Sequence, residues 1–262
     1  MDRYGLRPDK RLGQHFLVDP NQVERIVRLA GVHAGDNVIE VGPGLGALTV
    51  GLLDAGANVV AVEVDSDLVR VLDGELGDRP VRVVEADALD ADWAEIAPPD
   101  REWSMVANLP YNVATPLVLD VLDTVPQITS LLVMVQREVA ERFVAAPGTS
   151  AYGVPSVKVA FWATGALVAR IPPTVFLPPP RVESALVKLD RTPERRFDID
   201  VDEVFVLVRA AFGQRRKMLR KSLSGLIGSE TFDDAGIDAM ARPETLEISQ
   251  WVDLALARRK TG

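Results

Sequence analysis

The sequence predicts an α/β protein with a parallel β-sheet covered by helices, followed by a small all-helical C-terminal domain. From about residue 20 to residue 135, apolar runs of strand length alternate with helical patterns, which is typical of a parallel sheet with helices on both faces. Beyond residue 200 only helical periodicity remains. With 47% hydrophobic and 26% charged residues among 262, the composition is that of an ordinary globular protein, which excludes disorder.

The predicted strands are mostly near-continuous runs of Val, Leu and Ile, as expected for strands buried on both faces. They lie at residues 37–41, 58–64, 81–85, 103–107, 130–135 and 182–189. The predicted helices between them lie at residues 22–30, 47–55, 66–74, 114–122 and 138–145. Five of the nine residues at 172–180 are proline, which predicts a stiff, extended loop.

A polar connector at residues 191–200 predicts two domains, an α/β domain at 1–190 and a helical domain at 191–262. Glycines 213, 225, 228 and 236 are the expected breaks between the helices of the second domain.

Composition excludes several kinds of site. The formal charge of −9 argues against coating of nucleic acid by bulk positive charge, so a nucleic-acid site has to be a local basic patch. With no cysteine and two histidines, thiolate chemistry and Cys- or His-rich metal sites are excluded, and we expect no metal. No stretch has the length and apolarity of a signal peptide or membrane helix, so we expect a cytoplasmic protein that binds no membrane. We also expect a monomer.

Three consecutive strand ends carry candidate cofactor ligands. Gly42 and Gly44 lie in the turn after the first strand, where glycines allow the backbone to approach a ligand. Glu63 ends the next strand, where a carboxylate can accept the ribose hydroxyls of an adenosine cofactor. Asp87 and Ala88 follow the third and could meet the adenine edge, although Asp87 could simply cap a turn. Without a recognisable pyrophosphate site, this pattern favours S-adenosylmethionine over a dinucleotide.

The most specific motif is Asn108-Leu109-Pro110-Tyr111, directly after the fourth predicted strand. It resembles the (N/D)-P-P-(Y/F) box of methyltransferases that act on exocyclic amines. An adenine amine is a poor nucleophile because its lone pair is conjugated into the ring. The Asn108 side-chain oxygen and the Leu109 carbonyl could each accept one amine hydrogen and orient the nitrogen, while Pro110 stiffens the turn and Tyr111 stacks on the base.

The chain as a whole resembles the ribosomal RNA adenine N6,N6-dimethyltransferases, in particular the bacterial 16S rRNA dimethyladenosine transferases. The resemblance rests on blocks spread over nearly the whole chain: LGQHFLVD at 12–19, EVGPGLGALT at 40–49, ANLPYN at 107–112, MVQREVAERF at 134–143, PPTVFLPPPRVESALVKL at 172–189 and AFGQRRKMLRKSL at 211–223. It implies a class I (Rossmann-like) S-adenosylmethionine-dependent core. It also implies transfer of four methyl groups to two adjacent adenosines in the 3′-terminal hairpin loop of 16S rRNA in the small ribosomal subunit, with a role in subunit biogenesis.

The resemblance also carries over site residues. It implies cofactor contacts at His15, Leu17, Gly42, Glu63, Asp87 and Asn108. Position 15 is often asparagine in the family, so we expect His15 to contact the cofactor through its backbone before its side chain. Phe176, in the proline-rich loop, is implied to face the target base opposite Tyr111, and an aromatic clamp of this kind would offset the stacking that a flipped base loses.

A basic stretch is the candidate RNA contact. The six basic residues between positions 209 and 221, with no acid among them, are Arg209, Arg215, Arg216, Lys217, Arg220 and Lys221. On one helix, Arg216 and Arg220 would be i,i+4 neighbours, and so would Lys217 and Lys221. Bound RNA phosphates would neutralise this crowding of like charges. The alternative is that these residues form a solvent-exposed helix face with no ligand.

Three other functions compete. One is the related enzyme that dimethylates a single adenosine of 23S rRNA and confers macrolide-type resistance, although N-L-P-Y and the 211–223 block look more like the small-subunit branch. The second is a ribosome-assembly factor that acts by binding. The third is a nicotinamide-dependent oxidoreductase, which would leave the amine-orienting box without a use.

Overall fold

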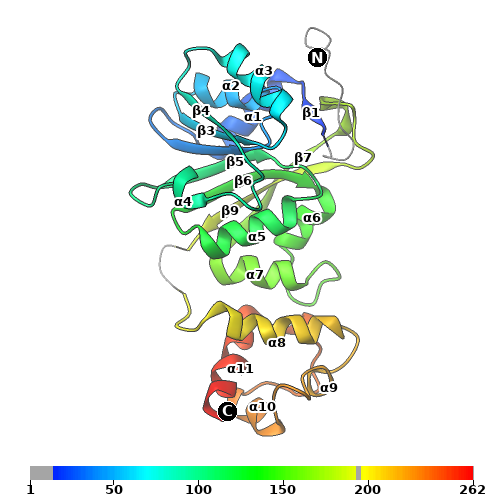
Figure 1. Ribbon diagram of the computed structural model, residues 1–262. Helices are drawn as coiled ribbons and strands as arrows, with labels where there is room; N and C mark the ends of the chain where they lie inside the picture. The colour runs from blue at the N-terminus through cyan, green and yellow to red at the C-terminus, as the bar shows by residue number, and fades with distance from the viewer. Residues whose placement is uncertain (1–13, 193–195, 262) are drawn as a thin grey trace. The chain divides into compact units, whose positions relative to one another are not determined.

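Seven strands form the main sheet, in the order β4-β3-β2-β5-β6-β9-β7 (Figure 1). In this computed structural model, which describes residues 14–192 and 196–261, β2 pairs in parallel with β3 and β5, β3 with β4, and β5 with β6. Strand β9 runs antiparallel to β6. The strands are β2 (Asn37–Val41), β3 (Asn58–Glu63), β4 (Val81–Glu85), β5 (Trp103–Asn108), β6 (Ile128–Gln136), β7 (Ala163–Ile171) and β9 (Ser184–Arg191).

The order of the strands creates a crevice at one edge of this sheet. The chain runs outward from β2 through β3 to β4, then returns to the other side of β2 as β5 and β6. Sheets of this kind bind ligands where the strand order reverses, beyond the carboxyl ends of the strands. That point lies between β2 and β5, next to the glycine turn and the Asn108 motif.

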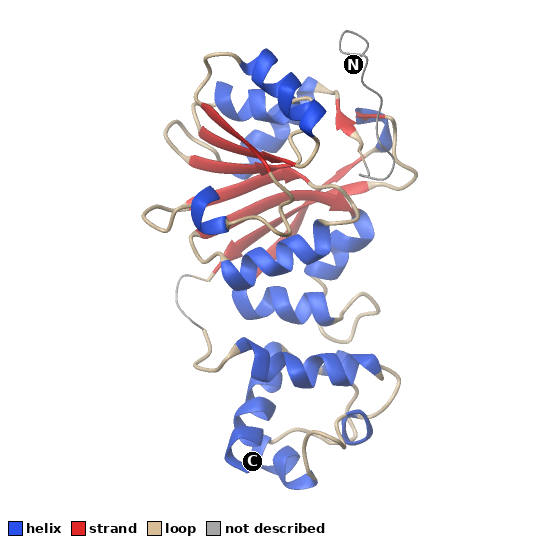
Figure 2. Ribbon diagram, viewed as in Figure 1, coloured by secondary structure: helices blue, strands red, loops and turns tan. Residues whose placement is uncertain are grey.

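Helices cover both faces of the sheet (Figure 2). On one side lie α1 (Pro20–Ala30), α2 (Ala47–Asp54) and α3 (Ser66–Leu76), and α5 (Ala114–Thr124) lies on the other (Figure 1). Helix α1 begins after Asp19, whose carboxylate caps the Asn21 amide, and buries Val23 and Ile26 in a core shared with α2, β2 and β3. The short α4 (Trp93–Ile96) precedes β5, and α6 (Arg137–Phe143) follows β6.

A second, two-stranded sheet joins segments far apart in the sequence. Strand β1 (Phe16–Leu17) pairs antiparallel with β8 (Phe176–Leu177), and the Val18 amide donates to the Val175 carbonyl. The proline-rich loop therefore contains a 3₁₀ turn, η3 (Pro173–Val175), followed by a two-residue strand. Through β1 and β8, the described start of the chain is held beside the loop that precedes β9.

The chain divides into two compact units, and the second is helical. It contains the described residues from Thr192 onward together with Glu141–Ala163, a segment that the predicted boundary at residue 190 assigns to the first domain. The reason is packing, since Tyr152, Val157 and Phe161 are buried with the C-terminal helices. The helical elements of the second unit are α7 (Val154–Trp162), α8 (Val201–Gly213), α9 (Leu219–Ser222), α10 (Ser229–Ala235), the 3₁₀ turn η4 (Pro243–Thr245) and α11 (Ile248–Thr261).

The α/β architecture and every predicted strand are confirmed, with ends that shift by at most a few residues. Helices α4 and α7, strand β7 and the two short strands β1 and β8 were not predicted from the sequence patterns. Helix α7 runs directly into β7 with no intervening loop. No cluster of turn residues therefore marks the change from the helical to the strand pattern of hydrophobic residues. Within residues 14–192 and 196–261, no helix combines the length and apolarity needed to cross a membrane, and no cluster of acidic or histidine side chains is arranged to hold a metal ion.

Candidate active site

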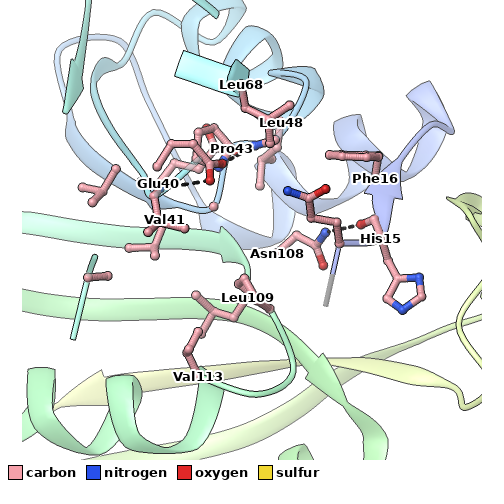
Figure 3. Close-up of a pocket in the computed structure, with 18 of the residues that line it drawn as sticks. His15, Phe16, Glu40, Val41, Pro43, Leu48, Leu68, Asn108, Leu109 and Val113 are labelled. Atoms are coloured by element: carbon pink, nitrogen blue, oxygen red, sulfur yellow. Dashed lines mark hydrogen bonds between the residues drawn. The ribbon is translucent and has the colours of Figure 1, made fainter. Parts of the chain in front are cut away.

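A cavity opens at the carboxyl edge of the sheet, between the β1 segment and the turns that follow β2, β3, β4 and β5 (Figure 3). The predicted site residues that it brings together are His15, Leu17, Gly42, Gly44, Glu63, Asp87, Ala88, Asn108, Leu109, Pro110 and Tyr111. All of them belong to the first unit. Phe176, in the same unit, does not line the cavity.

The glycine turn brings the cofactor side of this cavity close to the amine-orienting box. Gly42 has a φ of +69°, and a Cβ there would lie 3.2 Å from the Pro110 ring. Gly44 has a φ of +59°, and a Cβ there would lie 2.8 Å from the ring of Phe16. Both positions favour glycine because of the left-handed backbone, and at Gly44 a Cβ would in addition be too close to the Phe16 ring. The turn packs directly against the Asn108 motif on one side and against β1 on the other.

Glu63 is a buried carboxylate that is already well supplied with donors. Its Oε2 accepts from the Gly44 amide at 3.1 Å, and its Oε1 accepts from the amides of Val64 and Asp65 at 3.0 and 3.1 Å. Burial raises its pKa, and the three amides oppose that shift. A carboxylate can accept about four hydrogen bonds. One position is thus free for a ribose hydroxyl, and a second hydroxyl would have to share or replace an amide donor.

Asp87 and Ala88 form the far wall of the cavity. Oδ1 of Asp87 accepts from the Leu89 amide at 2.9 Å, so this side chain caps a turn, which was the structural alternative to a cofactor contact. The capping contact uses one oxygen, and the residue is exposed at the rim. Ala88 is buried. The capping contact and a contact of the other oxygen with adenine are therefore compatible.

The Asn108 motif lies at the end of β5 and forms the floor of the cavity. The Asn108 Nδ2 donates to the main-chain carbonyl of His15 at 3.1 Å, and the Leu109 amide donates to the Met134 carbonyl of the neighbouring strand. The Tyr111 hydroxyl shares a 2.7 Å hydrogen bond with the Ser184 hydroxyl, and burial raises the pKa of Tyr111. The tyrosine ring is thereby held at both its backbone and its tip.

Phe176 lies elsewhere in this structure. It pairs with Leu17 between β8 and β1 and is only 3% exposed, within the core that also contains α1 and α2. Alternation along the strand turns the next residue, Leu177, outward, with 50% of its surface exposed. A stacking contact between Phe176 and a target base therefore requires the side chain to leave this core.

Among the cavity residues that the sequence analysis did not assign to the site are Glu40, Gln14 and Phe16. Glu40, at the end of β2, is 1% exposed and accepts from the Thr49 hydroxyl. Gln14 donates to Oδ2 of Asp65, just after Glu63, and Phe16 packs on Gly44. An acidic residue in an otherwise apolar strand was an available signal for Glu40. Nothing local to residues 14–16 marks their proximity to residue 65 or residue 44.

The basic stretch does not form one helix, so the predicted i,i+4 pairs are wrong. Helix α8 ends at Gly213, residues 214–217 form turns, and α9 begins only at Leu219 after an extended Met218. Arg215 is bound to the carbonyls of Thr149 and Ser150. Arg209 lies 3.8 Å from Asp202. The four remaining cations, Arg216, Lys217, Arg220 and Lys221, are exposed, and no carboxylate in the described parts of the chain forms an ion pair with them.

Comparisons with known proteins agree with this geometry. Residues 6–259 match the family described as ribosomal RNA adenine dimethylase. The chain is 47% identical over its full length to 92% of the ribosomal RNA small subunit methyltransferase A of Cutibacterium acnes. It is 46% identical to that of Nocardia farcinica, with 97% of this chain and 91% of that protein covered.

Two solved structures share the fold. A dimethyladenosine transferase from Plasmodium falciparum superposes with a TM-score of 0.82 at 25% identity, over 95% of this chain and 98% of that chain. The 23S rRNA methyltransferase ErmE superposes with a TM-score of 0.69 at 24% identity, over 93% and 99%. At that identity the second match shows the fold alone.

Proposed function

Because the chain belongs to the ribosomal RNA adenine dimethylase family, we propose that it dimethylates the N6 amines of two adjacent adenosines in the 3′-terminal hairpin loop of 16S rRNA. The chain is thus an rRNA adenine dimethyltransferase, and its curated relatives carry the small-subunit name. The observation that carries the mechanism is the position of the Asn108 motif, which shares one cavity with the glycine turn and Glu63.

S-adenosylmethionine fits the residues of this cavity. Gly42 and Gly44 present main chain without side chains to the cavity, Glu63 retains an acceptor position for ribose, and Asp87 and Ala88 bound the adenine side. When bound, the cofactor supplies an electrophilic methyl group on a sulfonium and leaves as S-adenosylhomocysteine. We assign the cofactor contacts to His15, Leu17, Gly42, Gly44, Glu63, Asp87, Ala88 and Asn108.

The protein orients the amine and excludes water. Oδ1 of Asn108 and the carbonyl of Leu109 accept the two amine hydrogens, which favours a pyramidal nitrogen with its lone pair aimed at the methyl group. Pro110 stiffens the turn, and the Tyr111 ring, held by Ser184, stacks on the base. Phe176 would complete the clamp by turning out of its core position when a flipped adenine enters.

The helical unit supplies the RNA grip in this proposal. The exposed cations Arg216, Lys217, Arg220 and Lys221 are available for phosphates, whereas Arg215 is engaged with main-chain carbonyls and Arg209 with Asp202. We propose residues 191–262 as the rRNA-binding domain, joined by the Glu141–Ala163 segment that packs with it. The enzyme would act as a cytoplasmic monomer on the small ribosomal subunit.

Label mapping tests this function. The protein would be incubated with methyl-labelled S-adenosylmethionine and, in parallel, with small subunits that lack this modification, naked 16S rRNA and 23S rRNA. We expect N6,N6-dimethyladenosine in the 3′-terminal loop of 16S rRNA. Label in 23S rRNA would move the protein to the resistance-type branch. Retained subunit binding without label would indicate an assembly factor with a silent site.

A further inference from the structure

The amide of Asn108 can face the cavity with either of two opposite ends. Only its oxygen can accept a hydrogen from an amine, because the amide nitrogen is a donor. If the amide were rotated by 180°, two donors would face each other and the amine would lose one of its two orienting contacts. Transfer therefore requires a contact that selects one orientation of this amide.

The structure provides such a contact from the β1 segment. Nδ2 of Asn108 donates to the main-chain carbonyl of His15 at 3.1 Å, shown as a dashed line in Figure 3. A carbonyl oxygen is an acceptor only, so the rotated amide would place Oδ1 against another oxygen. The cost is a lost hydrogen bond and a repulsive contact in a partly buried site. The His15 carbonyl thus favours the amide orientation that leaves Oδ1 for the amine.

The His15 carbonyl is itself held by contacts on both sides. Nδ1 of the His15 ring lies 2.7 Å from the carbonyl of Pro178, to which it must donate. On one side, Gln14 donates to Asp65. On the other, Phe16 packs on Gly44 and pairs with Leu177. Each residue around the carbonyl is tied to a different part of the site.

We propose that the main-chain carbonyl of His15 is the positioning group for the catalytic amide of Asn108, and that the His15–Pro178 hydrogen bond holds this carbonyl in place. The proposal rests on the proposed function, because it assumes that Oδ1 of Asn108 accepts an amine hydrogen. It gives the histidine side chain a role in the chemical step, and the cofactor contact assigned to His15 is then made by its main chain.

Two substitutions of Asn108, by Asp and by Ala, distinguish a need for one orientation of the side chain from a need for any acceptor of the amine hydrogen. The aspartate carboxylate would face the His15 carbonyl with no hydrogen between them, whereas the protonated acid has the donor and acceptor pattern of the amide. We expect the kcat of Asn108→Asp, divided by that of the wild type, to rise at least about tenfold as the pH falls from about 9 to about 5.5. If an acceptor at this position were sufficient without the contact to the His15 carbonyl, the ratio would stay constant or decrease as the pH falls, and the proposal would be wrong.

Dividing by the wild type removes the titrations that the two enzymes share. The titratable side chains that line the same cavity are His15, Glu40, Glu63, Asp87 and Tyr111. Asn108→Ala is the reference for the mechanism itself. Near-normal turnover in Asn108→Ala would overturn the amine-orientation mechanism. If Asn108→Ala is inactive and the relative kcat of Asn108→Asp is highest at high pH, only the positioning by His15 is overturned.

A matched pair at His15 tests the support of the carbonyl. His15→Asn keeps a donor at the position of Nδ1 but loses the ring, which lies 5.5 Å from the Tyr111 ring. His15→Phe keeps the ring and loses the donor. We expect His15→Phe to lower kcat about tenfold with cofactor KM changed less than about threefold, and His15→Asn to retain most of kcat. The reverse order would show that the ring contact matters and would overturn the role of the hydrogen bond.

Discussion

The Thr49 hydroxyl donates a 2.6 Å hydrogen bond to Oε2 of Glu40, a carboxyl group that is only 1% exposed beneath the glycine turn. Burial raises the pKa of Glu40 to about 8, with a smaller contribution in the same direction from Glu63, while the Thr49 hydrogen bond opposes the shift. Without a ligand, this carboxyl is therefore mostly protonated at neutral pH. The cavity thus contains one neutral acid close to the carboxyl group that we assign to ribose.

The raised pKa predicts a pH-dependent effect of Glu40→Gln. Because the folded-state pKa lies above the ordinary value of 4.5, the stability that Glu40 contributes is complete below pH 4.5 and lost as the pH rises through about 8. Glutamine is neutral throughout and can still accept from Thr49. We expect the free energy of unfolding of the variant, relative to the wild type, to increase by up to several kcal/mol over that range. Urea unfolding without cofactor measures this, and a difference independent of pH would contradict it.

Gly44→Ala should damage both stability and cofactor binding. The new methyl group would lie 2.8 Å from the Phe16 ring at a φ of +59°, so either the turn or β1 has to move. We expect a loss of about 1–3 kcal/mol in the free energy of unfolding and weaker binding of S-adenosylmethionine by calorimetry. The control is Gly74→Ala in α3, where a Cβ meets nothing within 4 Å. That change should leave binding intact and add up to about 1 kcal/mol of stability.

The Tyr111–Ser184 hydrogen bond should matter more for stability than for turnover. Tyr111→Phe keeps the stacking face but leaves the fully buried Ser184 hydroxyl without this partner. We expect a loss of about 1–2 kcal/mol in the free energy of unfolding and a kcat within about threefold of the wild type. Adding Ser184→Ala should recover part of the stability, as a double-mutant cycle would measure. A large loss of kcat in Tyr111→Phe would instead give the hydroxyl a direct role in the reaction.

Charge reversal at two exposed arginines tests the basic surface. We expect Arg216→Glu with Arg220→Glu to weaken rRNA binding at least about tenfold and to reduce the dependence of log Kd on log salt by about one unit or more. Filter binding over a salt series measures both quantities. Arg28→Glu with Arg70→Glu applies the same charge change on α1 and α3. Equal effects of the two pairs would point to bulk charge and would refute a local patch.

Much of the fold could be predicted because its signals are local. The apolar runs of β2 and β6 and the glycines at 42 and 44 report burial and backbone conformation over a few residues. Local signals failed where a helical hydrophobic pattern passes directly into a strand pattern without turn residues between them, as at the junction of α7 and β7. They also failed after the break that was correctly expected at Gly213, because the i,i+4 pairs of residues 216–221 assumed one helix and the chain instead turns at 214–217 before α9 begins at Leu219.

The amino-acid sequence by itself determined the alternating architecture, the placing of Gly42, Glu63 and Asn108 at strand ends, and the chemistry that these side chains can perform. Only the tertiary structure decided that His15 meets Pro178, 163 residues away, that its carbonyl accepts from the Asn108 amide, and that Phe176 is buried. The physical reason is range. Periodicity and turn preference act over a few residues, whereas a hydrogen bond between distant segments depends on how the whole sheet closes.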